Sequence, residues 1–274
     1  MNGYQIVSES ELFYKQKDFD ENDLNLLMTR LSVAASKQNY LIKSLGTVNE
    51  YPILVLIPRH FSIAPNILIS AGFHGNEVAP CWSILRILES SKVLLKECNV
   101  SFLPCVNPTG FKEDTRNNIF DENPNRGFIT NDVKLPKKEK IPSAEGKLIL
   151  DKFKYISKLA RDGFLTMHED RERNGFYLYS TKKKQEEIEQ KLLNVGALYF
   201  GTYEKELIDK PNKKAIVNNG IARDVSDGSL EDYLEHTGVP ICITTETSSK
   251  QELYKRIWVN MSLIKTFIEH FSRT

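Results

Sequence analysis

The chain has 274 residues, which is enough for one large α/β domain or two small ones. Lys and Arg number 37 against 36 Asp and Glu, so the net charge of +1 gives no electrostatic reason to expect a nucleic-acid or anionic-membrane partner. The N-terminus lacks an apolar stretch behind a basic start, and no apolar run reaches about 18 residues, which argues against a secretory signal and a membrane span. Four scattered cysteines without a C-x-x-C spacing indicate reduced thiols and a cytoplasmic protein.

The first half of the chain predicts a helix followed by several strands. Leucines at helical spacing behind an acidic start indicate a helix at residues 20–37. Apolar runs of strand length predict strands at residues 40–48, 51–57, 66–70 and 99–106. One segment with helical periodicity predicts a helix at residues 80–89. Residues 111–142 show no apolar periodicity, and a loop of this length is typical of a functional or disordered segment.

The second half continues the alternation of strands and helices. The same patterns predict helices at residues 143–161, 184–200 and from about 251 onward, and strands at 164–167, 176–179 and 239–244. This alternation favours a mixed α/β fold, with a largely parallel, twisted sheet and helices on both of its faces. Because no repeat or linker is visible, we expect one catalytic domain over residues 1–274, with a helical lead-in at 1–38 and an α/β core at 39–274.

Four polar segments follow apolar strands directly. They begin at His74, Asn107, His168 and Glu246. In open parallel sheets, ligands bind beyond the carboxyl ends of the strands. We therefore expect these four positions to meet at one edge of the sheet.

His74, Glu77 and His168 are the candidate metal ligands. His74 and Glu77 can turn to the same side if a helix begins after Gly75, and His168 follows 94 residues after His74 at the end of another strand. Zinc in a hydrolase usually takes three such ligands and keeps one position for a water, whose pKa it lowers toward about 7. One zinc ion is expected, with cobalt or manganese able to replace it in vitro. Taken singly, each residue could also be a solvated surface or rim side chain.

Glu246 is the candidate general base. A carboxylate near the metal-bound water must accept its proton, and Glu246 stands at the end of a strand between Thr245 and Thr247. Taken alone, this carboxylate could instead cap a helix or form a salt bridge. Its position at a strand end, like those of the candidate ligands, favours the catalytic role.

Short motifs around these residues occur in one order along the chain. They are His74-Gly-Asn-Glu77, Asn107-Pro-Thr-Gly-Phe111, Thr115-Arg116-Asn117, Pro124-Asn125-Arg126, Met167-His168, Gly228-Ser229-Leu230 and Glu246. From about residue 40 to 250, the chain thereby resembles the zinc carboxypeptidases of the carboxypeptidase A type. The resemblance implies a zinc carboxypeptidase-like fold and a metallocarboxypeptidase that hydrolyses a C-terminal peptide or peptide-like amide bond with metal-activated water.

The resemblance also implies roles for residues between the metal motifs. Arg116 would face the developing oxyanion, where a fixed cation in a dry site is worth several kcal/mol. Arg126 would hold the terminal carboxylate of the substrate with its planar fork, assisted by the amide of Asn125. Both arginines could also lie on a solvated loop.

Two positions depart from the pattern of this family. The family often has an aspartate two residues before its Asn-Arg pair, which orients the first metal histidine. Here Asn123 occupies that position and Asp121 lies two residues further back, so either Asp121 substitutes or a neutral acceptor holds His74. The family's mobile tyrosine, which covers the bound C-terminal residue, is replaced by Arg223, because Tyr233 lies on the wrong side of the Gly-Ser match.

Other charged residues near the motifs have two interpretations each. Arg223 could bend toward an acidic group of the substrate or pair with Asp224 or Asp227. Glu169 and Asp170 could recruit a second metal ion, but side chains next to a ligand on a strand more often point away from the ion.

Two alternative functions stay open. The Gly-Asn within the first metal motif is also similar to murein peptide amidases and to the aspartoacylase and succinylglutamate desuccinylase group, which implies an amidase or deacylase for cell-wall peptides or N-acyl amino acids. That group typically carries a β domain after its glutamate, whereas the 28 residues after Glu246 predict one helix, which favours the peptidase. A non-catalytic binding protein with a relic metal site is the other alternative. For an enzyme of either kind, the expected partner is a peptide or small amide substrate.

Overall fold

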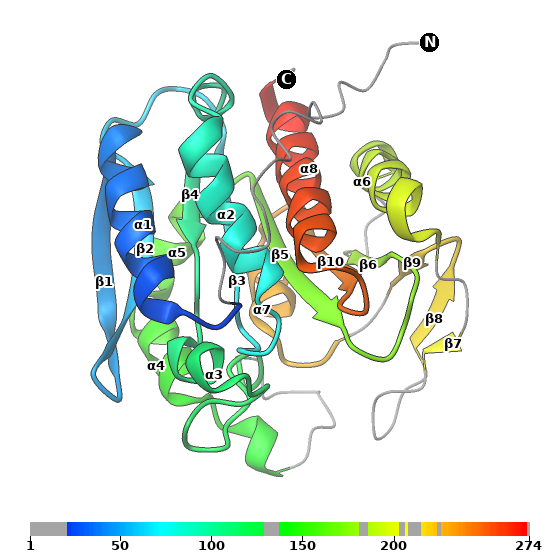
Figure 1. Cartoon of the computed structure of the whole chain (residues 1–274), viewed down its shortest axis with the longest axis horizontal. Coiled ribbons are helices and arrows are strands. Elements are labelled where there is room, and N and C mark those ends of the chain that lie inside the picture. Colours follow the sequence, from blue (N-terminus) through cyan, green and yellow to red (C-terminus); the bar gives the residue numbers. More distant parts are fainter. Residues whose placement is uncertain are drawn as a thin grey trace.

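The structure is a computed structural model, and it describes residues 21–128, 137–180, 186–202, 206–207, 215–223 and 226–272. Its strands are β1 (Tyr40–Val48), β2 (Tyr51–Pro58), β3 (Asn66–Ala71), β4 (Asn99–Leu103), β5 (Gly163–Asp170), β6 (Tyr177–Ser180), β7 (Glu206–Leu207), β8 (Ala215–Asn218), β9 (Ile221–Ala222) and β10 (Cys242–Ser248). Within the described ranges these strands form one sheet in the order β1-β2-β4-β3-β5-β10-β6-β9-β8-β7 (Figure 1).

The centre of this sheet is parallel. β4, β3, β5 and β10 are neighbours in that order and pair in parallel, so their carboxyl ends point to the same edge. β2 and β1 extend the sheet antiparallel on one side, and β6 pairs antiparallel with β10 on the other. The register sets Glu246 of β10 opposite His168 of β5. The predicted mixed α/β sheet is therefore confirmed.

Helices cover both faces of the sheet, as predicted (Figure 1). One face carries α1 (Leu24–Lys37), α2 (Ala79–Ser90), α6 (Glu186–Phe200) and α8 (Leu253–Ser272), and the other carries α4 (Ala144–Asp151), α5 (Phe153–Leu159) and α7 (Leu230–His236). The short helix α3 (Pro108–Glu113) and the 3-10 turns η3 (Leu94–Lys96) and η4 (Lys137–Lys140) lie in connections. Among the described residues, no helix combines the length and the apolarity that a membrane crossing requires.

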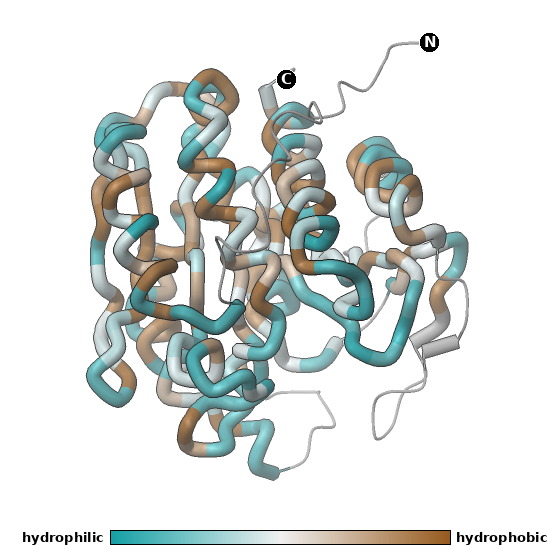
Figure 2. The backbone as a smooth tube through the Cα atoms, viewed as in Figure 1, coloured by the Kyte–Doolittle hydropathy of each residue, from teal (hydrophilic) through white to brown (hydrophobic). Residues whose placement is uncertain are grey.

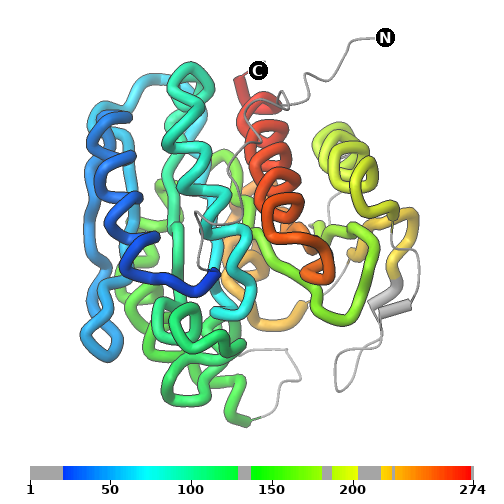
Figure 3. Tube along the Cα trace, viewed as in Figure 1, coloured from blue at the N-terminus to red at the C-terminus, as the bar shows by residue number. Residues whose placement is uncertain are grey.

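Side chains of the central strands point alternately to the two faces of the sheet, so each strand contributes residues to both apolar cores. Ile67 and Ile69 of β3 belong to the core under α1, α2, α6 and α8, whereas Leu68 between them belongs to the core under α4, α5 and α7. Figure 2 shows apolar colour along these strands and hydrophilic colour on the loops beyond their lower ends in this view. Figure 3 shows the red C-terminal helix α8 standing between the cyan α2 and the yellow-green α6, although these three segments are far apart in the chain.

Prediction and structure differ mainly at the ends of elements. The predicted helix at 143–161 is two helices, α4 and α5, which meet at Lys152 with φ −109° and ψ 15°. The apolar period continues through this break, so the sequence does not reveal it. The strands expected to end at Met167 and Thr244 run on to Asp170 and Ser248. The sequence patterns do not predict the helices α3 and α7, which complete at most two turns, or the strands β7, β8 and β9, which have two to four residues.

Candidate metal centre

The loop after β3 is packed tightly against the loop after β4. Gly72 turns the chain with φ +68°, a conformation that favours glycine. A Cβ added at Gly75 would lie 1.9 Å from the carbonyl carbon of Gly110, so only glycine allows this contact. Asn107 caps α3 by accepting from the Gly110 amide at 2.8 Å, and its own amide donates to the Arg116 carbonyl at 3.3 Å. The Asn107 side chain thus fixes the loop after β4. This loop is joined to the loop after β3 by backbone packing and by two backbone hydrogen bonds, from Asn107 to the Gly72 carbonyl at 2.8 Å and from Gly75 to the Arg116 carbonyl at 3.4 Å.

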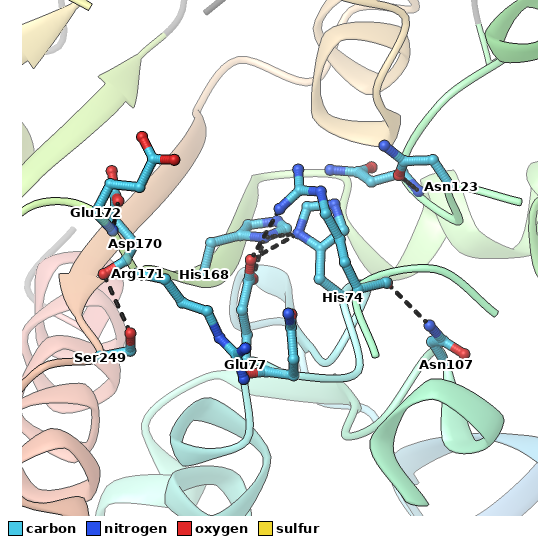
Figure 4. Close-up of polar contacts among 12 residues, drawn as sticks. His74, Glu77, Asn107, Asn123, His168, Asp170, Arg171, Glu172 and Ser249 are labelled. Atoms are coloured by element: carbon cyan, nitrogen blue, oxygen red, sulfur yellow. Dashed lines mark hydrogen bonds and ion pairs between the residues drawn. The ribbon is translucent and has the colours of Figure 1, made fainter. Parts of the chain in front are cut away.

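The three candidate ligands meet at this edge of the sheet (Figure 4). The Nδ1 atom of His74 lies 2.8 Å from Oε1 of Glu77, and Nδ1 of His168 lies 2.7 Å from Oε2 of the same carboxylate. The two Nδ1 atoms are 3.2 Å apart. All three side chains are buried, and within the described part of the chain they are the one group of this kind that could hold a metal ion.

The donor set and its spacing fit a tetrahedral ion. Bonds of about 2.0–2.1 Å to zinc place neighbouring ligand atoms about 3.4 Å apart. The observed separations of 2.7, 2.8 and 3.2 Å are shorter than this, so the side chains would move apart by less than about 1 Å to hold the ion. Two imidazoles and one carboxylate leave a fourth position for water, as in hydrolytic zinc sites. The Nε2 atom of His74 is buried without a hydrogen-bond partner, whereas Nε2 of His168 lies 3.4 Å from the Thr166 hydroxyl.

Burial and mutual charge set the protonation of the three groups. Burial lowers the pKa of His74 to about 3, although Glu77 opposes this shift. Burial would also lower the pKa of His168, but the Glu77 carboxylate outweighs it and raises that pKa to about 9. Burial alone would raise the pKa of Glu77, but the two imidazoles hold it well below its usual range. At neutral pH these shifts favour a protonated His168 beside an ionised Glu77 and a neutral His74.

Glu246 lies beside the ligands on the neighbouring strand. Its partners across the sheet are His168 on β5 and Tyr177 on β6. Burial raises the pKa of Glu246 to about 8, with further increases from Glu77 and Asp170, while His168 opposes the shift. This carboxyl group therefore has the proton affinity that a general base near neutral pH needs.

One cavity of about 460 Å³ joins these groups to the predicted substrate-binding residues. Its lining includes all seven residues singled out in the sequence: His74, Glu77, Arg116, Asn125, Arg126, His168 and Glu246. A cavity of this size is typical of a small-molecule or peptide-end site. The side chain of Arg116 is 51% exposed, and its Nη1 atom lies 3.4 Å from Oε1 of Glu77.

The far end of the cavity is more acidic than the sequence suggests. The Asn125 amide nitrogen lies 3.2 Å from both carboxylate oxygens of Glu231, and its Oδ1 accepts from the Leu230 amide. Arg126 donates to the Asn125 carbonyl at 2.6 Å and pairs with Asp227 at 3.1 Å. Sequence reasoning does not identify Glu231 and Asp227 as partners of these two residues. The only available signal is their position on either side of the Gly-Ser motif.

The structure gives His74 neither of the expected acceptors. Asp121 is largely exposed and binds Asn117 and Lys138. The Oδ1 atom of Asn123 accepts from the Asn125 amide instead. The expectation that Asp121 substitutes for the missing aspartate is therefore wrong, because its side chain points to solvent.

Arg223 has a partner that the sequence does not predict. It pairs with Glu189 of α6, and one of the two contacts measures 2.7 Å. The expected partner Asp224 lies outside the described residues. Tyr233 packs against Phe153 on the core side of α7, with ring centroids 4.4 Å apart and ring planes tilted by 39°. Arg223 is thus tied to a helix rather than covering the cavity.

The neighbours of His168 do not form a second metal site. Glu169 accepts two hydrogen bonds from Arg256 at 2.7 Å. Asp170 accepts from the Tyr177 hydroxyl at 2.7 Å and pairs with Arg173 at 2.8 Å. Both side chains are buried, and their charges are compensated by these protein groups. Glu169 points to the face opposite His168, whereas Asp170 lies on the same face as His168 and lines the cavity.

Comparisons with known proteins agree with this geometry. A family model described as the succinylglutamate desuccinylase/aspartoacylase catalytic domain matches residues 63–263. A crystal structure of a candidate metallopeptidase from Shewanella denitrificans is 31% identical, with a TM-score of 0.85 over 95% of this chain and 96% of the other. Another from Shewanella baltica is also 31% identical, with a TM-score of 0.85 over 94% and 97%. None of the curated proteins compared matches the sequence.

More distant structures share the fold. A metallo-carboxypeptidase from Burkholderia cenocepacia is 13% identical, with a TM-score of 0.64 over 90% of this chain and 68% of the other. The zinc carboxypeptidase-like architecture expected from the motifs is therefore confirmed, whereas membership of the carboxypeptidase A subgroup is not.

Proposed function

Because the chain belongs to the succinylglutamate desuccinylase/aspartoacylase catalytic-domain family, we propose that it is a zinc-dependent hydrolase that cleaves a peptide or peptide-like amide bond. The observation that carries this proposal is the convergence of His74, Glu77 and His168, whose donor atoms lie within 4.8 Å of one another. A zinc ion held by them supplies a Lewis acid and lowers the pKa of a water toward about 7.

Glu246 is the proposed general base. It lies next to His168 in the sheet register and lines the same cavity. In this role the Glu246 carboxylate takes the proton of the attacking water and later gives it to the leaving nitrogen. Glu246→Gln keeps the shape of the side chain but cannot accept a proton.

Arg116 is the proposed oxyanion-binding residue. Its half-exposed side chain makes one long contact, to Glu77, so little interaction energy opposes its turning toward a substrate carbonyl. A guanidinium at that position stabilises the negative charge of the tetrahedral intermediate more than that of the neutral carbonyl.

Arg126, with Asn125, is proposed to bind the carboxylate of the amino acid that leaves. Arg126 is 14% exposed, and the fork of its guanidinium lines the cavity while one arm pairs with Asp227. A substrate carboxylate would share this guanidinium with Asp227. We infer that the substrate is an amide whose leaving amino acid carries a free carboxylate, as at the C-terminus of a peptide.

A deacylase for N-acyl amino acids is the second candidate, which the family match over residues 63–263 favours. The peptidase and the deacylase would release the same leaving group, an amino acid with a free carboxylate. Their substrates differ in the acyl group on the other side of the amide bond. Zinc-loaded protein should be assayed on dipeptides and on N-acetyl and N-succinyl amino acids, each with a free and an amidated carboxyl group.

The proposed function predicts that the wild-type protein hydrolyses one of these series and that amidation of the substrate's carboxyl group strongly lowers the rate. The variant Glu246→Gln should retain zinc but show no turnover. Equal rates on free and amidated substrates would remove the role of Asn125 and Arg126. A wild-type protein that binds zinc but hydrolyses neither series would point to the binding-protein alternative.

A further inference from the structure

A buried ion pair lies behind the metal centre, on the α8 side of the sheet. We propose that Arg256 of α8 is a positioning residue of this centre: through Glu169, it holds the turn that carries Glu77 against the strand that carries His168. This inference rests on the proposed metal site.

The contacts between Arg256 and Glu169 are bidentate and dry. Nε and Nη2 of Arg256 donate to the two carboxylate oxygens of Glu169, both at 2.7 Å. The side chains are 7% and 0% exposed. Such parallel hydrogen bonds fix the orientation of the carboxylate as well as its position.

Glu169 in turn caps the helix that follows Glu77. Its Oε2 atom accepts from the backbone amide of Ala79, the first residue of α2, at 3.0 Å. Val78 at the N-cap position has no side chain that can accept this bond. A carboxylate from β5 therefore satisfies an otherwise orphaned amide and complements the positive end of the helix.

This arrangement couples two ligands that are far apart in the chain. Glu169 follows His168 directly on β5 and points to the opposite face of the sheet. Ala79 lies two residues after Glu77. The chain of contacts from Arg256 to Glu169 to Ala79 therefore fixes the spacing between the backbone of the second ligand and that of the third.

A second contact from the same helix reaches His168. One turn after Arg256, the amide of Asn260 lies 3.3 Å from the Thr247 hydroxyl, and this hydroxyl donates to the carbonyl of His168 at 3.3 Å. The amide of Asn260 also donates to the Arg256 carbonyl at 2.9 Å. Hence α8 is linked to two consecutive residues of β5, to Glu169 directly and to His168 through Thr247 of β10.

The test must separate positioning from general stability. Arg256→Met alone leaves the Glu169 charge buried and unpaired, which destabilises the whole fold. The double variant Arg256→Met/Glu169→Leu removes both charges together, a replacement that is often neutral for folding. It also removes the acceptor for the Ala79 amide, so the spacing between ligands is no longer fixed.

Zinc dissociation constants, measured by chelator competition, and melting temperatures of the metal-free proteins are the two readouts. The double variant leaves the buried Ala79 amide without its acceptor, so we expect a melting temperature below that of the wild type but no lower than that of the control variant described next. We expect it to bind zinc about 10–100-fold more weakly, the usual effect of losing a residue that supports a metal ligand. The matched control is Ile264→Ala, which truncates a fully buried α8 side chain and leaves Glu169 unchanged. This variant should have a lower melting temperature, but its zinc affinity should stay within about twofold of wild type.

Zinc binding by the double variant within about twofold of wild type would overturn the positioning role while the metal site stands. Weakening of the same size in Ile264→Ala would also overturn it, because general destabilisation would then explain the result. If the wild-type protein itself fails to bind zinc, both this inference and the proposed function are wrong.

Discussion

Zinc binding should displace one proton from His168. In the metal-free protein, Glu77 outweighs the effect of burial and raises the pKa of His168 to about 9, whereas burial keeps His74 neutral above about pH 3. A metal ion needs both imidazoles unprotonated, so below about pH 9 it competes with a single proton. The apparent affinity should therefore rise about tenfold per pH unit, or about 100-fold between pH 6 and pH 8, equivalent to about 2.7 kcal/mol.

The measurement is calorimetric titration of metal-free Glu246→Gln with zinc, in buffers of different ionisation enthalpy. The substitution matters because burial raises the pKa of Glu246 to about 8, and a nearby cation would release a second proton from it in the wild type. We expect about one proton released per zinc ion in the variant at pH 7, and more than one in the wild type. Affinity that does not change between pH 6 and pH 8 would refute the assignment of the proton to His168.

Two further substitutions test the loops around the site. Gly75→Ala brings a Cβ to 1.9 Å from the Gly110 carbonyl carbon, so we expect a loss of about 1–3 kcal/mol in unfolding free energy and weaker zinc binding. The control Gly146→Ala in α4, whose nearest atom is 3.2 Å away, should change the unfolding free energy by less than about 1 kcal/mol and leave zinc binding unchanged. Calorimetry and chelator competition measure both, and a Gly75→Ala protein with wild-type zinc affinity would contradict the tight packing of the two loops. Arg116→Ala should lower kcat by about 10²–10³-fold with unchanged zinc content, and an unchanged kcat in steady-state assays would exclude the oxyanion role.

The sequence predicts the fold class and the meeting of the candidate ligands at one edge of the sheet. His74 follows β3, whereas His168 and Glu246 lie near the ends of β5 and β10, where apolar runs give way to polar residues. Parallel pairing then brings these positions together, since Glu246 and His168 are partners in the register. Glu77 is singled out by its spacing from His74 and by the motif resemblance, so the choice of candidate ligands rests on motifs as well as on hydrophobic patterns.

Contacts between loops could not be predicted in the same way. Glu231 approaches Asn125 across 106 residues, and Arg256 reaches Glu169 across 87. No periodicity or motif connects such pairs, because their meeting depends on how helices dock on the sheet. For the same reason the sequence could not show that Asp121 does not substitute for the missing aspartate, which it would do from two residues further back in the chain: its side chain is largely exposed.

Charge balance explains how so buried a site is stable without a metal ion. A lone carboxylate between two neutral imidazoles would leave an uncompensated buried charge, which is costly. The proton on His168 neutralises Glu77, and the raised pKa of Glu246 keeps that second carboxyl group largely uncharged at neutral pH. A divalent ion held by these ligands would reverse both conditions, because it needs the His168 proton to leave and its positive charge favours ionised Glu246. The proposed general base would then be generated by the same event that fills the site, so we expect the metal-free protein to lack both the nucleophile and the group that activates it.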